Sequence, residues 1–368
     1  MKVKFSYLEK QFSNCNGLWA GLKNIVSNGD FTLGKELENF EKNFSKLIGS
    51  KYALGVASGT DAIKLSLRIL NIGRGDEVIT AANTFIATAG AIIEVGAKPV
   101  FVDCDDTFCM DVNLVEKKIT HKTKAILPVH YTGYMANMPK LIKLSKKYKI
   151  PIVEDSCQGI LAEINKKKAG TWGDFGAFSL HPLKTINVWG DGGIITTNNY
   201  SHYKKLKMIR NHGLINRDEA NVTGHNSRLH NLQAAVGNYI LPKARSITKR
   251  KIQIAKYYDK ALSKIPKITI PPRIKNHKIV YHLYIIFAEE RDKLIKHCLK
   301  KGIEAKIHYP KPLYLQKALK GLKHKRGDFP VTDSHVKKII SLPCNQYMKN
   351  QQINYVANTI KDFYKKNS

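Results

Sequence analysis

Short apolar runs alternate with helical stretches along the first two thirds of the chain. Strand-like runs occur at Glu77–Thr80, Pro99–Val102, Ala125–Val129 and Ile150–Val153, and an amphipathic stretch at Met138–Lys147 separates the last two. Parallel strands need a long crossover between them, which is usually a helix. The alternation therefore predicts an α/β fold with a large, mostly parallel sheet and helices on both faces.

Beyond about residue 248 the pattern changes. A long helical segment around residues 229–250, kinked at Pro242, leads into this region. We predict antiparallel strands at Tyr281–Ala288 and Glu304–Tyr309 that flank a helix at Arg291–Lys301, and a last helix at Asn350–Lys365. The 368 residues, 43% of them hydrophobic, suffice for two cores. We therefore divide the chain into a large domain, residues 1–247, and a small C-terminal α+β domain, residues 248–368.

One lysine follows an apolar run on an irregular turn. Lys184 closes the segment from Gly173, and Pro182 ends the strand because proline lacks a backbone N–H. A glycine-rich segment, Gly190–Gly193, comes shortly afterwards. A lysine presented in this way is a candidate Schiff-base nucleophile. Most lysines in so basic a chain are solvated surface charges, so this motif needs support from elsewhere.

A second segment supplies a carboxylate. The strand at Ile150–Val153 leads into Asp155, and open α/β sheets bind ligands at the carboxyl ends of their strands. Pyridoxal phosphate needs a lysine for its aldehyde and an acid that keeps its ring nitrogen protonated. The ordinary alternative is that Asp155 caps a helix and Lys184 is a loop charge.

A third segment offers a phosphate site. Ser58-Gly59-Thr60 stands between a short strand and an amphipathic helix. The N–H groups and hydroxyls of such a turn bind phosphate, although most such turns are simple helix caps. The phosphate turn, the acid and the lysine in this order together predict one pyridoxal-phosphate site.

The chain resembles the DegT/DnrJ/EryC1/StrS sugar aminotransferases, a group of fold-type I pyridoxal-phosphate enzymes. The resemblance extends over nearly the whole chain. Besides the three segments above, it is carried by Gly29–Gly34, Ala82–Thr88, Arg210–Gly213, Gly224–Arg228, Ile307–Pro310 and Ser341–Pro343.

The resemblance implies a role for each matching position. Lys184 would hold the cofactor aldehyde and shuttle the proton, Asp155 would pair with the ring nitrogen, and Gln158 would lie near the phenolic oxygen. The implied phosphate contacts are Ser58, Gly59, Thr60 and Ser179. Phe85 would lie against the ring face, and Asn226 would reach the partner's phosphate in a homodimer with shared active sites. The implied substrate contacts are His181, His308 and Tyr309.

The implied activity is ping-pong transamination from glutamate, or a similar donor, to a nucleotide-linked keto-sugar. Another acceptor is an open alternative, either a small phosphorylated ketone or a cyclitol precursor. A non-catalytic regulator on the same fold is a third hypothesis, which the presence of both Lys184 and Asp155 disfavours.

Composition excludes several classes of function. The net charge of +32 is large, but the lysines are spread over many segments instead of forming one stripe, so we expect no nucleic-acid partner. The histidines lack metal-ligand spacing, and we expect no metal. No apolar run is long enough for a membrane span. Six scattered cysteines without a Cys-x-x-Cys pair, and no secretory signal, favour the cytoplasm.

Overall fold

The computed structural model describes residues 1–366. The strands of its large sheet are β1 (Tyr52–Val56), β2 (Glu77–Ala81), β3 (Lys98–Val102), β4 (Thr123–Leu127), β5 (Val153–Asp155), β8 (Phe175–Ser179) and β9 (Gly193–Thr197). Their order is β3-β2-β4-β5-β8-β9-β1, with β4 and β5 joined by single bridges such as Val129 to Asp155. Strand β9 runs antiparallel to both of its neighbours, β8 and β1, whereas the ladders β3-β2, β2-β4 and β5-β8 are parallel. The predicted α/β fold with a mostly parallel sheet is confirmed.

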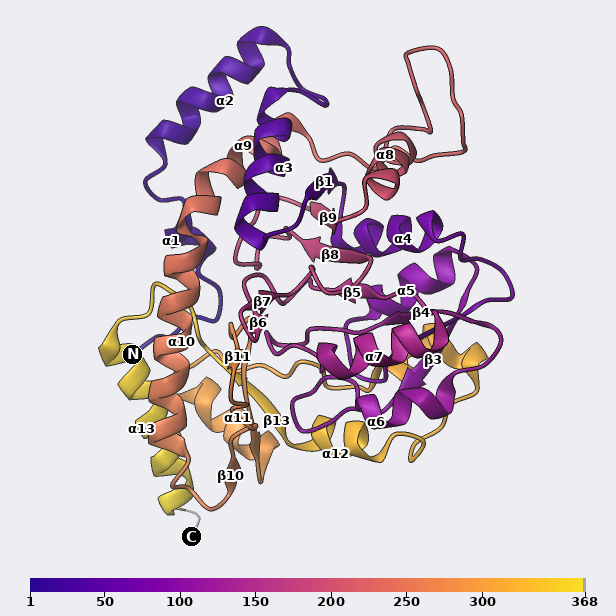
Figure 1. Cartoon of the computed structure of the whole chain (residues 1–368). Coiled ribbons are helices and arrows are strands. Elements are labelled where there is room, and N and C mark those ends of the chain that lie inside the picture. Colours follow the sequence, from indigo (N-terminus) through magenta and orange to yellow (C-terminus); the bar gives the residue numbers. More distant parts are fainter. Residues whose placement is uncertain (367–368) are drawn as a thin grey trace.

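Helices of the first part of the chain surround this sheet (Figure 1). They are α1 (Leu8–Gln11), α2 (Asn16–Asn28), α3 (Lys35–Ile48), α4 (Gly59–Ile69), α5 (Ile86–Glu94), α6 (Val112–Val115), η1 (Glu116–Lys118), α7 (Met138–Tyr148), α8 (Tyr200–Ile209) and α9 (Asn231–Ile240). Helix α4 packs across β5, β8 and β9, whereas α3 packs on β1 and α9. The position of α4 brings its N-terminus close to the ends of the strands that carry Asp155 and Ser179.

The C-terminal region contains a second, antiparallel sheet. Its strands are β10 (Ile268–Thr269), β12 (Tyr284–Ala288) and β13 (Ile339–Leu342), in the order β10-β12-β13. The accompanying helices are η2 (Leu241–Lys243), α10 (Ala244–Leu262), α11 (Arg291–Lys300), η3 (Leu313–Leu315), η4 (Lys317–Leu322), α12 (Pro330–Lys338) and α13 (Asn350–Lys366). Pro242 lies in η2, the 3-10 turn that separates α9 from α10.

The predicted strand at Glu304–Tyr309 is wrong. On the edge of β12 away from β10, the partner is β13, whose four residues are all buried. The segment 304–309 makes one bridge, from Lys306 to Ser341. Lys306 is exposed, whereas Ile339 and Ile340 are fully buried, so β13 buries more apolar surface beside β12.

Contacts at several places join the N-terminal and C-terminal parts. The short strands β6 (Glu163–Ile164), β7 (Lys167–Lys168) and β11 (His277–Lys278) form a small sheet. At the N-terminus, Val3 pairs with Ile303, and the Phe5 N–H donates to the Glu304 carboxylate at 2.8 Å. One buried apolar cluster accordingly contains side chains of both sheets. The division at 247/248 falls inside α10 and stays a prediction.

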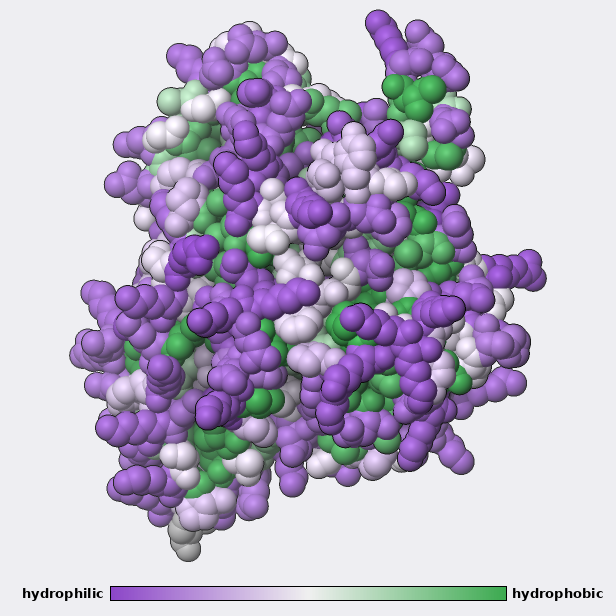
Figure 2. Space-filling view, in the orientation of Figure 1, coloured by the Kyte–Doolittle hydropathy of each residue, from purple (hydrophilic) through white to green (hydrophobic). Residues whose placement is uncertain are grey.

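The surface is dominated by polar side chains. Figure 2 shows hydrophilic residues over most of the visible face, on elements from both parts of the chain. Within residues 1–366, no helix combines the length and the apolar character that crossing a membrane requires.

Candidate active site

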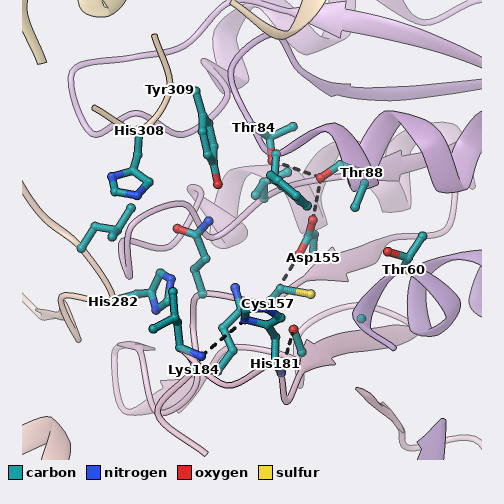
Figure 3. Close-up of a pocket in the computed structure, with 18 of the residues that line it drawn as sticks. Thr60, Thr84, Thr88, Asp155, Cys157, His181, Lys184, His282, His308 and Tyr309 are labelled. Carbon is teal, nitrogen blue, oxygen red and sulfur yellow. Dashed lines mark hydrogen bonds between the residues drawn. The ribbon is translucent and has the colours of Figure 1, made fainter. Parts of the chain in front are cut away.

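A cavity of about 360 Å³ lies where the large sheet meets the C-terminal region. Except for Asn226, every residue predicted for the site lines it (Figure 3). These residues are Ser58, Gly59, Thr60, Phe85, Asp155, Gln158, Ser179, His181, Lys184, His308 and Tyr309. The fold therefore brings segments that are far apart in the sequence to one hollow of ligand size.

The N-terminus of α4 forms one end of the cavity. Ser58 caps this helix, and its Oγ accepts from the Asp61 N–H at 3.0 Å. A Cβ atom at Gly59 would lie 2.8 Å from the Cβ of Ser179 and 2.9 Å from the Sγ of Cys157. Only glycine therefore allows the start of α4 to come so close to β8. Free N–H groups and hydroxyls at such a helix start suit a phosphate.

Asp155 is held by donors at the end of β5. Its Oδ2 accepts from the Thr88 hydroxyl at 2.8 Å, and the Thr88 hydroxyl lies 3.0 Å from that of Thr84. Its Oδ1 accepts from the Cys157 N–H at 3.2 Å. Sequence reasoning missed both threonines as site residues, although they belong to a segment that carries the family resemblance. Their hydroxyls fix the direction of the carboxylate (Figure 3).

Glu154, directly before Asp155, points into the protein on the opposite side of the strand. Its carboxylate accepts from the backbone N–H groups of Gly170 (2.9 Å), Trp172 (2.6 Å) and Gly173 (2.8 Å). Its Oε2 also lies 2.8 Å from the Nε2 of His130, and both side chains are fully buried. This carboxylate is fully hydrogen-bonded and lies outside the cavity.

Lys184 lies in a turn in which its N–H donates to the His181 carbonyl at 2.8 Å. The Tyr7 hydroxyl lies 3.2 Å from the Lys184 carbonyl and 3.3 Å from that of Leu183, so the N-terminal segment supports this turn. No hydrogen bond or ion pair among residues 1–366 engages the Lys184 amine. Burial lowers the pKa of Lys184, against the opposing effect of Cys157 and Asp155. A larger fraction of the amine is therefore neutral and able to attack a carbonyl carbon.

The C-terminal region forms the opposite wall. Burial raises the pKa of Tyr309 to about 12, and its ring lies 5.7 Å from that of Phe85. The Nδ1 of His308 lies 2.8 Å from the Ser341 hydroxyl, and burial, followed by Lys306 and Lys184, lowers the pKa of His308 to about 4.

Sequence reasoning missed several further residues of this cavity. Phe5 and Tyr7 come from the N-terminus, and His282 lies just before β12. Lys251 enters from α10. The sequence does contain a signal for Lys251, because this lysine takes a position of the helical repeat that apolar residues otherwise occupy.

Asn226 lies outside the cavity of its own chain. It is exposed and pairs with Asn211 at the base of the loop that links α8 to α9. This loop projects from the body of the protein (Figure 1) and carries the exposed apolar residues Ile215 and Val222.

These residues fit pyridoxal phosphate. The start of α4, which Gly59 allows to lie close to Ser179, offers N–H groups to a phosphate. Asp155 offers an oriented carboxylate, and Lys184 offers an amine that has no hydrogen-bond partner among residues 1–366. When bound, this cofactor withdraws electrons from the reacting carbon of the substrate. Within residues 1–366, no group of three or more histidine, cysteine or acidic side chains is arranged for a metal ion.

Comparisons with known proteins agree with this geometry. The profile of the DegT/DnrJ/EryC1/StrS aminotransferase family matches residues 18–361. A pleiotropic regulatory protein of Geobacillus stearothermophilus is 36% identical, over 94% of this chain and 93% of its own. A UDP-N-acetyl-3-dehydro-α-D-glucosamine 3-aminotransferase of Acidithiobacillus ferrooxidans is 36% identical, over 93% and 92%. The structure of Streptomyces venezuelae DesV with a ketimine intermediate superposes with a TM-score of 0.96, at 34% identity over 99% and 98% of the two chains.

Proposed function

Since the chain belongs to the DegT/DnrJ/EryC1/StrS aminotransferase family and is a pyridoxal-phosphate-dependent enzyme, we propose that it aminates a nucleotide-linked keto-sugar. The amino group would come from glutamate or a similar donor. The relative named as an aminotransferase of a UDP-linked sugar supports this acceptor class. The observation that carries the proposal is the unpaired amine of Lys184, which shares one cavity with Asp155 and the start of α4.

Each wall of the cavity would contribute a separate task. Lys184 would hold the cofactor aldehyde and then move a proton between the substrate carbon and the cofactor carbon. Asp155 would hold the proton on the ring nitrogen, in an orientation fixed by Thr88. The phosphate would be bound by Ser58, Gly59, Thr60 and Ser179.

The remaining contacts surround the cofactor ring and the sugar. Phe85 would lie against the ring face, and the Gln158 amide would lie near the phenolic oxygen. The Gln158 Oε1 already accepts from the Thr132 N–H at 2.8 Å, which leaves its NH₂ as the donor. The proposed substrate contacts are His181, His308 and Tyr309.

We also propose a homodimer in which Asn226 completes the partner's phosphate site. Asn226 cannot serve its own cavity, and the loop beside it exposes Ile215 and Val222. A second copy would bury this apolar surface. The proposed small domain, residues 248–368, would supply the second wall of each cavity. If sedimentation at assay concentration showed that the active protein is a monomer, the proposal of a shared phosphate site would be wrong.

The proposed function is tested by absorbance spectroscopy of the purified protein with added pyridoxal phosphate. We expect a visible band from the cofactor bound to Lys184, which glutamate bleaches and a suitable keto-sugar nucleotide restores. UDP-linked and dTDP-linked 3-keto and 4-keto sugars form the acceptor panel. A band that no amino donor changes would contradict the proposal and favour a regulator.

A further inference from the structure

A second lysine in the cavity has no task in the proposed mechanism. Lys251 lies on α10, its side chain is only 2% exposed, and it lines the same cavity as Lys184. It occupies the buried face of the helix, four residues after Ile247 and three before Ile254. This spacing normally carries an apolar side chain. A lysine at such a position needs a compensating interaction.

Lys251 has no carboxylate partner among residues 1–366. The ion pairs formed by these residues do not include it, and the positive charge that acts on it is that of Lys184. Burial lowers the pKa of Lys251, and the positive charge of Lys184 lowers it further, against the opposing effect of Cys344. A buried ammonium without a partner is costly, and a bound anion would remove that cost.

The neighbouring side chains on this wall also favour an anion. Burial holds the pKa of His282 well below its usual range, and the charges of Lys184, Lys251, His308 and His181 act in the same direction. The carboxylates that line the cavity are Asp155, which is occupied by Thr88 and Cys157, and the exposed Asp191. Among the described residues, the wall with Lys251 therefore has N–H donors without an acidic counterpart.

We propose that Lys251 binds the α-carboxylate of the amino donor while the donor's amino group lies beside Lys184. This inference rests on the proposed function. In an amino acid the carboxylate and the amino group are bonded to the same carbon. One amino-acid ligand lying between the two lysines of this small cavity therefore brings its amino group to Lys184 and its carboxylate to Lys251. The diphosphate of a sugar nucleotide is separated from the keto carbon by the sugar ring, and its nucleoside needs an open path to solvent.

The test uses a dicarboxylate that cannot react. Glutarate is titrated calorimetrically into the holoenzyme, and UDP is titrated separately to represent the diphosphate. The variants are Lys251→Met, which removes the charge, Lys251→Arg, which keeps it, and Lys256→Met, an exposed lysine on the same helix, as a control. We expect Lys251→Met to weaken glutarate binding by about 10-fold to 100-fold, the range of a charged hydrogen bond. Lys251→Arg is expected to retain more of the affinity.

Turnover and stability give independent readouts. The KM for glutamate should rise in Lys251→Met with a smaller change in kcat, because a binding contact is lost. The melting temperature should not fall, since the amine has no hydrogen-bond or ion-pair partner in the described part of the chain. Weaker binding of UDP with unchanged glutarate binding would overturn the proposal in favour of a diphosphate site. A lower melting temperature with unchanged glutarate binding would assign Lys251 a structural role instead.

Failure of the proposed function would look different. If glutamate left the cofactor spectrum of the native protein unchanged while glutarate binding still depended on Lys251, the carboxylate site would stand and the transamination would not. If the native holoenzyme did not bind glutarate, the carboxylate site would be overturned.

Discussion

The two walls of the cavity differ in how their polar groups are held. On the wall from the large sheet, Asp155 accepts from Thr88 and Cys157, and the helix start at Ser58 is capped. On the C-terminal wall, the Lys251 amine and the His282 ring form no hydrogen bond with the described residues. The first wall is preorganised for a ligand that stays in place. The second keeps free donors, as expected where substrates of different shape enter and leave.

The largest effect on turnover is expected for Lys184→Ala, which removes the reactive amine from the cavity. We expect turnover to fall by at least about 10³-fold, because the covalent link to the cofactor and the proton carrier are both lost. The fold should persist, since no described residue forms a hydrogen bond or ion pair with the Lys184 amine. Initial rates and the visible spectrum check this, with the exposed Lys166→Ala as the matched control. Normal activity of Lys184→Ala would mean that the mechanism is misassigned.

Glu154→Ala tests whether the hydrogen-bonded carboxylate behind the first wall, next to Asp155 in the sequence, serves the fold. The change leaves three backbone N–H groups and His130 without their acceptor. We expect a loss of about 3–5 kcal/mol in the free energy of unfolding, as for a broken buried pair. Denaturant unfolding measures this loss.

The adjacent substitution Asp155→Asn keeps the shape of the side chain and removes its charge. We expect turnover to fall by about 10²-fold with little change in stability, because an amide cannot hold the proton on the ring nitrogen. Steady-state kinetics and thermal unfolding are compared with those of Glu154→Ala. If Asp155→Asn mainly destabilised the protein, the carboxylate would be structural.

The difference between the walls also explains what sequence could predict. The first wall consists of short contiguous motifs at strand ends, so Ser58, Asp155 and Lys184 could be proposed from local patterns. The second wall depends on how the C-terminal sheet and α10 pack, and no local pattern gives the place of His282. The strand at 304–309 was mispredicted because pairing with β12 depends on long-range burial, which favoured Ile339–Leu342. Lys251 was detectable only as a charged residue inside an apolar helical period.

A smaller effect is the pH dependence of stability, which two buried histidines, one in the cavity and one remote from it, both influence. His308 in the cavity and His335 on α12 both have pKa values of about 4 because of burial. In the unfolded chain a histidine titrates near about 6.5. The unfolded state therefore binds protons that the folded state excludes, and stability falls as the pH drops from about 6.5 to about 4. Each histidine contributes a slope of at most about 1.4 kcal/mol per pH unit.

His335→Gln should reduce this slope without altering glutarate binding, whereas His308→Gln should reduce the slope and also change ligand affinity. Urea unfolding at a series of pH values, with calorimetry at neutral pH, separates the two. Equal effects of both variants on ligand affinity would contradict the assignment of His308 to the cavity wall.

The smallest effect concerns the surface charge, which contrasts with the buried charge of Lys251. With a net charge of +32, the protein should attract anionic sugar nucleotides, and kcat/KM for them should fall several-fold between low and high salt. Exposed charges are screened over about 8 Å at physiological ionic strength, whereas buried contacts are screened much less. Lys251→Met should therefore weaken glutarate binding by the same factor at low and at high salt. The attraction of sugar nucleotides by the surface charge should be lost at high salt. A kcat/KM for sugar nucleotides that is unchanged by salt would remove any role for the surface field in their encounter with the protein.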